Sequence, residues 1–105
     1  MKKFSDILPT LENTDHVQHI ELFNDDGSSA GVIENKPGSQ GSVKLYHHLW
    51  KKWGNITIDA AKEGLKLYAE HTEDAEINPG KHPNIDYLFS VIEDKKPLSV
   101  KIVAS

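Results

Sequence analysis

The chain has 105 residues and a mass of 11.8 kDa, a size that corresponds to one domain spanning residues 1–105. It carries 16 acidic residues against 12 basic ones, all Lys, and the net charge of −4 argues against a dedicated nucleic-acid or anionic-membrane binder. Because Cys is absent, disulfides, Cys-ligated metal centres and thiolate nucleophiles are excluded. No apolar run approaches the ~20 residues of a membrane helix, and we expect a cytoplasmic protein.

The first residues predict a short amphipathic helix. Apolar side chains recur there at spacings of three and four residues, at Phe4, Ile7, Leu8 and Leu11. Pro9 lacks a backbone N–H and limits this helix to about two turns, so a loop should follow.

A β-hairpin is predicted next. Polar and apolar residues alternate over residues 16–24, so odd positions from Val17 to Phe23 should share one face and even positions the other. Turn-forming residues at 25–28 then lead into a second strand over residues 30–34.

A longer helix is predicted over residues 42–54, after a Gly-rich loop. Ser42 is a suitable N-cap and Gly54 a suitable terminator. The apolar stripe of this helix consists of Val43, Tyr46, Leu49, Trp50 and Trp53.

Two more helices and a closing strand complete the chain. One helix begins at residues 55–57 and fades near His71, and a polar, acidic loop follows from Thr72 to Lys81. Pro83 suits the first position of the last helix, which ends before Pro97. Residues 98–104 alternate again and predict a strand.

This order of elements predicts an α+β fold. The hairpin and the C-terminal strand should form a small, mostly antiparallel sheet, with three main helices packed on one face of it. Exposed edges of such a sheet are compatible with a homodimer.

The predicted helix over residues 42–54 carries a basic face. This stretch contains three Lys and no acidic residue, whereas the chain on either side of it is acidic. The face consists of Lys44, His47, His48, Lys51 and Lys52. It could bind an anionic protein or small molecule, or it is the ordinary solvated face of an amphipathic helix.

Residues 70–86 contain a candidate metal site. Two imidazoles and a carboxylate, from His71, His82 and either Asp74 or Asp86, could hold Zn²⁺, Mn²⁺ or Fe²⁺. The spacing matches no established metal-binding motif. In the alternative interpretation, His71 favours the negative end of its helix and His82 orders the loop.

The loop before the long helix is a candidate anion site. Gly38, Ser39, Gly41 and Ser42 lead into a helix N-terminus, where free N–H groups can hold a phosphate or carboxylate. The loop lacks the Gly-Lys-Ser/Thr ending of a nucleotide-binding loop, and a flexible connector that ends in an N-cap is the alternative.

Several segments resemble a small family of uncharacterised bacterial proteins, a proteobacterial domain of unknown function. The resemblance implies a free-standing, soluble, intracellular bacterial protein and brings no activity or cofactor with it. Its residues are PGSQGSVKLYHHL (37–49), Gly54, Ala60-Ala61, AEHTEDA (69–75) and PGKHPNIDYL (79–88).

The sequence therefore supports three functions and does not decide whether the protein is an enzyme. A non-catalytic binding module that uses the basic face ranks first, because no catalytic signature is recognisable. A metal-binding protein or metal-dependent enzyme ranks second, and a binder of a small anion ranks third.

Overall fold

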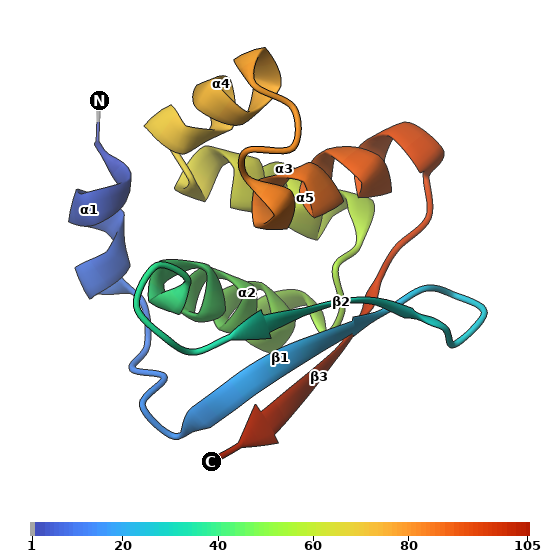
Figure 1. Ribbon diagram of the computed structural model, residues 1–105, viewed down its shortest axis with the longest axis horizontal. Coiled ribbons are helices and arrows are strands. Elements are labelled where there is room, and N and C mark those ends of the chain that lie inside the picture. The colour runs from blue at the N-terminus through green and yellow to red at the C-terminus, as the bar shows by residue number, and fades with distance from the viewer. Residues whose placement is uncertain (1) are drawn as a thin grey trace.

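Three strands, five α-helices and one short 3-10 helix build the fold in the computed structural model, which describes residues 2–105 (Figure 1). The predicted α+β class is confirmed. In chain order the elements are α1 (Phe4–Ile7), the 3-10 helix η1 (Leu8–Thr10), β1 (Val17–Phe23), β2 (Ser29–Glu34), α2 (Gln40–Trp53), α3 (Ile58–Leu67), α4 (Glu70–Ile77), α5 (Pro83–Asp94) and β3 (Ser99–Ala104).

The sheet has the strand order β2-β1-β3, and both pairs of strands are antiparallel. Ile20 in the middle of β1 lies opposite Ile33 on one side and Ile102 on the other. The helices all lie on one side of this sheet (Figure 1). The predicted combination of a hairpin and a C-terminal strand under a helical layer is therefore confirmed.

A β-bulge near the start of β1 changes which side chains face the helices. The register against β3 shifts between Val17 and His19, so Gln18 is an extra residue on β1. Val17, Ile20 and Leu22 are all buried in the core. The prediction that Val17 shares a face with His19 is wrong, because strict alternation does not allow for an extra residue.

The core lies between the sheet and the helices, and α3 approaches α5 closely within it. A Cβ atom at Gly64 of α3 would lie 2.7 Å from Leu88 Cδ1 and 2.9 Å from Leu49 Cδ1. Fully buried side chains of this size each contribute about 1.5–3 kcal/mol. The largest of them include Ile20, Leu22, Ile33, Leu45, Tyr46, Leu49, Ile85, Leu88 and Val91.

The predicted loop over residues 72–81 is wrong, because α4 occupies much of it. Only Ala75 of α4 is buried, so the helix has almost no apolar periodicity by which a sequence could reveal it. Ala69 adopts the uncommon φ of 54° and separates α3 from α4. The helix that was expected to fade near His71 therefore ends at Leu67, and the separate helix α4 follows it.

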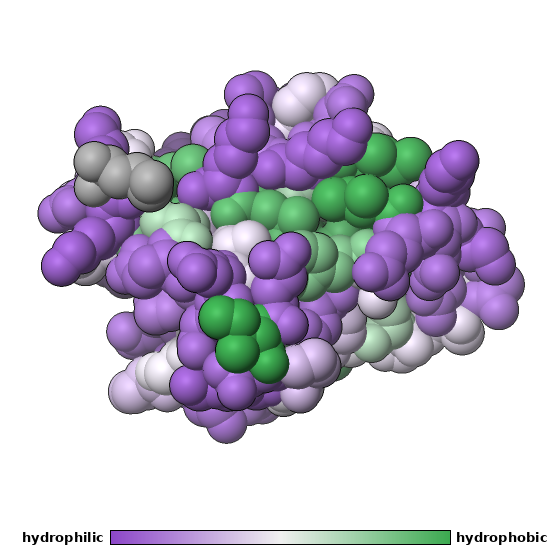
Figure 2. Space-filling view, turned by 90° about the horizontal axis from the view of Figure 1, so that it is seen from above, coloured by the Kyte–Doolittle hydropathy of each residue, from purple (hydrophilic) through white to green (hydrophobic). Residues whose placement is uncertain are grey.

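Hydrophilic side chains cover most of the helical side when the molecule is viewed from above, with hydrophobic ones between them in a central band (Figure 2). Three large hydrophobic residues within residues 2–105 are clearly exposed, namely Val32, Trp53 and Ile77. Val32 lies on β2 and the other two lie at helix ends. Scattered exposure of this kind is normal for a small protein.

Candidate functional site

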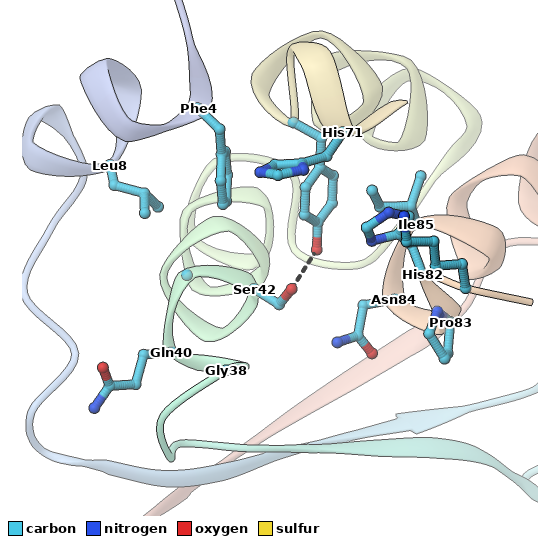
Figure 3. Close-up of a pocket in the computed structure, with 13 residues that line it drawn as sticks. Phe4, Leu8, Gly38, Gln40, Ser42, His71, His82, Pro83, Asn84 and Ile85 are labelled. Carbon is cyan, nitrogen blue, oxygen red and sulfur yellow. Dashed lines mark hydrogen bonds between the residues drawn. The ribbon is translucent and has the colours of Figure 1, made fainter. Parts of the chain in front are cut away.

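A pocket between the N-termini of α2 and α5 brings two of the predicted sites together (Figure 3). Its volume is about 420 Å³. We call it the α2–α5 pocket. Its lining comes from the N-terminal helices (Phe4, Leu8), the start of α2 (Gly38, Gln40, Gly41, Ser42), the segment around the start of α4 (Tyr68, His71) and the start of α5 (Lys81 to Ile85).

The predicted anion-binding loop forms one side of this pocket. α2 begins at Gln40, so the N-cap position belongs to Ser39, and the prediction of Ser42 as the N-cap is wrong. The Ser39 hydroxyl donates to the carbonyl oxygen of Glu34 and does not cap the helix. The N–H groups of Gly41 and Ser42 have no hydrogen-bond partner within residues 2–105. These donors, together with the positive end of the helix dipole, are available to an anion.

The N-terminus of α5 forms the opposite side of the pocket. Pro83 is its first residue and brings no N–H, whereas the N–H of Asn84 has no partner in the part of the chain that the structure describes. The Ile85 N–H donates to the His82 carbonyl at 3.0 Å. The Asn84 carbonyl accepts a hydrogen bond from the buried Tyr46 hydroxyl, which fixes the start of α5 against α2.

Asp74 and His82 form a hydrogen-bonded pair at the edge of the pocket. His82 Nε2 lies 2.6 Å from Asp74 Oδ2, and Lys81 Nζ lies 3.0 Å from the same oxygen. The Asn78 amide donates to the other oxygen of Asp74 at 3.0 Å. The hydrogen bonds from His82 and Lys81 lower the pKa of Asp74 to about 2. The carboxylate therefore stays ionised and fixes the orientation of the His82 ring.

His71 lies beside His82 and contacts the N-terminal helix. The centroids of the two imidazoles are 5.7 Å apart, and the Phe4 ring meets His71 edge-on at 5.3 Å. His71 Nε2 is 4.0 Å from Glu70 Oε2. The other oxygen of Glu70 accepts the Phe4 N–H at 2.8 Å, and this backbone hydrogen bond lowers the pKa of Glu70. The same carboxylate thus holds α1 against α4.

Only part of the predicted metal set comes together. His71, Asp74 and His82 are neighbours, whereas Asp86 accepts the Gly80 N–H at 3.1 Å and orders the loop instead. Within residues 2–105, no group of three or more His, Asp and Glu side chains is arranged so that it could hold a metal ion. Binding of Zn²⁺, Mn²⁺ or Fe²⁺ by this set stays a prediction.

An aromatic wall closes the third side of the α2–α5 pocket. Phe4 stacks on Tyr68 with ring centroids 5.2 Å apart, and the Tyr68 hydroxyl donates to Ser42 Oγ at 2.8 Å. Burial raises the pKa of Tyr68, so its hydroxyl keeps its proton. A Cβ atom at Gly41 would lie 3.0 Å from the Phe4 ring and 3.2 Å from Leu8 Cδ1. A glycine at this position lets the N-terminal helices approach α2 closely.

The predicted basic face of α2 is interrupted. His47 is buried, with 4% of its surface exposed, so the prediction of a continuous face is wrong at this residue. His47 follows the buried Val43 by four residues and therefore lies on the same side of the helix. This spacing could have predicted the burial of His47, but the neighbouring charges favoured a basic face. Burial lowers the pKa of His47, and its Nδ1 has no hydrogen-bond partner within residues 2–105.

The remaining charges of this face are mostly paired. Glu12 accepts hydrogen bonds from Lys51 at 2.8 and 2.9 Å. Glu63 accepts one from Lys52 and lies 2.6 Å from His48 Nε2, and these contacts lower its pKa although burial opposes the shift. Lys44 lines a separate polar pocket with Asn13, Thr14, Asp15, Asn35 and Gln40.

Sequence reasoning missed several residues of the α2–α5 pocket. Phe4 falls on the apolar stripe of the predicted N-terminal helix and Tyr68 in the helix predicted to fade near His71, and nothing in the pattern shows that they meet at a cavity. Lys81 falls in the predicted loop. For Asn84 the sequence contains one indication of its role: it follows Pro83 at a predicted helix start, where an N–H without a partner is expected.

A known protein family matches nearly the whole chain. Residues 4–102 match the family described as "Uncharacterized protein conserved in bacteria (DUF2322)". The chain belongs to this bacterial family. The resemblance to uncharacterised bacterial proteins is thereby confirmed, and the family description names no activity. Neither a curated protein nor a solved structure matches the chain. Among residues 2–105, every helix is too short or too polar to cross a membrane.

Proposed function

We propose that this protein binds a small anionic molecule in the α2–α5 pocket. One observation carries the proposal: the unpaired N–H groups of Gly41, Ser42 and Asn84, at the N-termini of two helices, belong to residues that line the same pocket. A helix N-terminus is equivalent to about half a positive charge, and its free N–H groups are ready donors for an anion. The volume of about 420 Å³ lies in the range of small-molecule sites.

The pocket also indicates what kind of anion it would take. The two helix N-termini offer backbone donors and the Ser42 hydroxyl, whereas the third side of the pocket is the apolar wall of Phe4 and Leu8 (Figure 3). A phosphate or carboxylate group would bind between the helix N-termini, and an apolar part of the same molecule would pack on Phe4.

This proposal replaces the basic face as the leading function. An anionic partner would have to compete with Glu12 for Lys51 and with Glu63 for Lys52, because these charges are already paired. The donors in the α2–α5 pocket have no such competitors among residues 2–105.

The proposal is tested with the substitution Ser42→Asp, which places a carboxylate at the start of α2. Inorganic phosphate, sulfate and small carboxylates should raise the Tm of the wild-type protein. Ser42→Asp should abolish this rise, because its own carboxylate occupies the donors. Without ligand its Tm should be equal or higher, since an acidic residue near a helix N-terminus contributes about 0.3–1 kcal/mol.

The matched control is Ser99→Asp, which adds the same charge at an exposed position of β3. It should retain the full ligand-induced rise in Tm. An equal rise in wild type and Ser42→Asp would show that the anions act elsewhere, and the proposal would then be abandoned.

Metal binding is the second candidate: residues 2–105 hold no group of three side chains arranged as a metal site, and the one observation in its favour concerns His82 alone. A carboxylate that holds one ring nitrogen of a histidine, as Asp74 holds His82 Nε2, is the usual way to orient an imidazole toward a metal. Elemental analysis of natively purified protein tests this candidate. Stoichiometric Zn, Mn or Fe that is lost in His71→Ala would support it, and sub-stoichiometric metal that this substitution does not change would argue against it.

A further inference from the structure

We infer that a second pocket of the protein binds a free hydrophilic amino acid in its zwitterionic form. This pocket lies between α2 and the segment that leads into β1, and we call it the Lys44 pocket. Its volume is about 510 Å³. Binding there is independent of the proposed function, because the two pockets share only Gln40. The residues that line the Lys44 pocket are all polar or charged: Asn13, Thr14, Asp15, Asn35, Gln40 and Lys44.

The composition of this lining indicates a hydrophilic ligand. Most small-molecule sites are lined largely by apolar side chains, with a few polar groups that orient the ligand. Within residues 2–105, no aliphatic or aromatic residue lines the Lys44 pocket, so an apolar part of a ligand would find nothing to pack against. The volume of about 510 Å³ is nevertheless in the range of such sites. A small molecule that is polar along its whole length is therefore the class that fits.

The part of the lining on α2 supplies hydrogen-bond donors and a positive charge. Gln40 and Lys44 are four residues apart and therefore lie on the same face of this helix. Figure 3 shows that the Gln40 side chain extends away from Asn84, on the side of the segment that leads into β1. Lys44 forms no ion pair within residues 2–105, whereas the other two Lys of α2 are paired. A carboxylate can therefore approach Lys44 without displacing another one.

The part of the lining outside α2 supplies hydrogen-bond acceptors and a negative charge. The Asp15 carboxylate accepts one hydrogen bond, from Asn13 Nδ2 at 3.3 Å, and forms no ion pair within residues 2–105. Asn35 donates through Nδ2 to the carbonyl oxygens of Thr14 and Val17, at 2.9 and 2.7 Å. These two bonds fix the Asn35 side chain, and its Oδ1 has no partner among the described residues.

Thr14 is the most buried residue of this lining, with 5% of its surface exposed. Its carbonyl oxygen accepts hydrogen bonds from the Val17 N–H at 3.0 Å and from the Asn35 amide. Its hydroxyl, in contrast, has no hydrogen-bond partner in the part of the chain that the structure describes. Buried polar groups nearly always have a partner. A ligand that donates hydrogen bonds in this pocket would provide one.

The two sets of groups match the two ends of an amino acid. An ammonium group has three N–H donors, for which Asp15, Asn35 Oδ1 and the Thr14 hydroxyl are acceptors. A carboxylate accepts hydrogen bonds from Lys44 Nζ and the Gln40 amide. Because Asp15 and Lys44 line the same pocket without pairing with each other, both charges are available to one ligand. A molecule with only one charge would leave the other charge of the pocket without a partner.

The experiment uses L-serine as the probe, together with two analogues that each lack one charge. N-Acetyl-L-serine lacks the ammonium group, and L-serinamide lacks the carboxylate. Each compound is titrated into the wild-type protein at about pH 6, where a free α-amino group is protonated, and backbone amide signals are followed by NMR. L-Serine should shift the amide signals of Thr14, Asp15 and Asn35. The Kd of each analogue should be at least about fivefold higher.

Two variants test which charge of the pocket binds which end of the ligand. Lys44→Gln should raise the Kd for L-serine about fivefold and abolish the preference for L-serine over L-serinamide. Asp15→Asn should raise it similarly and abolish the preference over N-acetyl-L-serine. The matched controls Lys62→Gln and Asp25→Asn remove the same charges at exposed positions outside the pocket. Both controls should bind L-serine as the wild type does.

The amide of Asn84 reports separately on the α2–α5 pocket. If L-serine at about 50 mM shifts none of the amide signals of Thr14, Asp15 and Asn35, amino-acid binding is overturned, whatever occurs at Asn84. It is also overturned if both analogues bind to the wild type as tightly as L-serine, a comparison that requires no variant to fold. If anions leave Asn84 unaffected while L-serine shifts the Lys44 pocket, the proposed function falls and amino-acid binding stands.

Discussion

At the scale of single residues, the least expected feature is a buried histidine without a full set of hydrogen bonds. His47 lies between the aromatic rings of His16 and Trp50, with centroid distances of 5.6 and 5.5 Å. The nearest carboxylate oxygen, from Glu12, is 3.7 Å from its Nδ1 and is engaged by Lys51. A buried polar atom that lacks a partner costs about 1–3 kcal/mol.

Replacement of His47 by Leu should therefore make the stability less dependent on pH. Burial lowers the pKa of His47, so the unfolded state binds a proton on this residue more readily than the folded state does. The corresponding contribution to stability is present above pH ~6.5 and is lost as the pH falls toward the pKa of His47 in the folded state. His47→Leu should be as stable as wild type or up to about 1 kcal/mol more stable at pH 7, with a larger advantage at pH 5. Urea unfolding at both pH values measures this.

The control for that prediction is His48→Leu, one residue further along α2. His48 is partly exposed and pairs with Glu63 at 2.6 Å, so its loss should lower stability. Equal pH dependence in His47→Leu and wild type would contradict our account of the buried imidazole.

At the scale of elements, two glycines set how closely the helices pack. Gly64 faces the side chains of Leu88 and Leu49, which are themselves fully buried and have little room to move. Gly41 faces Phe4 and Leu8, which belong to short N-terminal helices without any buried residue. The absence of a Cβ atom thus allows close contact with rigid, buried side chains at Gly64 and with helices that can shift at Gly41.

We expect Gly64→Ala to destabilise the protein and Gly41→Ala to have a much smaller effect. Each substitution gains up to about 1 kcal/mol of helix propensity. At position 64 overpacking should cost about 1–3 kcal/mol, whereas at position 41 the N-terminal helices can shift outward. Urea unfolding curves compare the two variants, and equal stability of both would refute this distinction.

At the scale of the whole molecule, many carboxylates stabilise the folded state through hydrogen bonds and ion pairs. Each has its pKa lowered in the folded protein, so its stabilising effect is present above its unfolded-state pKa and is lost as the pH falls through the lowered value. The groups are Glu12, Asp26, Glu34, Glu63, Glu70 and Asp74.

The Tm should consequently fall on acidification from about pH 5 toward pH 2, the value near which Asp74 titrates. About 1 M NaCl should weaken this dependence, because most of these groups are exposed and such salt reduces the Debye length to about 3 Å. Thermal unfolding at a series of pH values, with and without salt, checks both statements. A Tm that stays constant or rises below pH 5 would contradict them.

The sheet and the helices α2 and α5 could be predicted because their apolar periodicity is strong. α4 could not, since Ala75 is its only buried residue, and the bulge that turns Val17 inward has no pattern of its own. For the site, the sequence indicated Ser42, His71 and His82 individually. Their meeting in one pocket depends on contacts between distant segments, which no local pattern encodes.

The central position of β1 has a consequence for protein synthesis. Its partner β3 is made only after all five helices, so one edge of β1 stays without its strand while most of the chain leaves the ribosome. During that time its backbone could pair with a strand of another nascent chain. For this topology, the interval between the synthesis of β1 and that of β3 is the period in which this edge of β1 is without its partner strand.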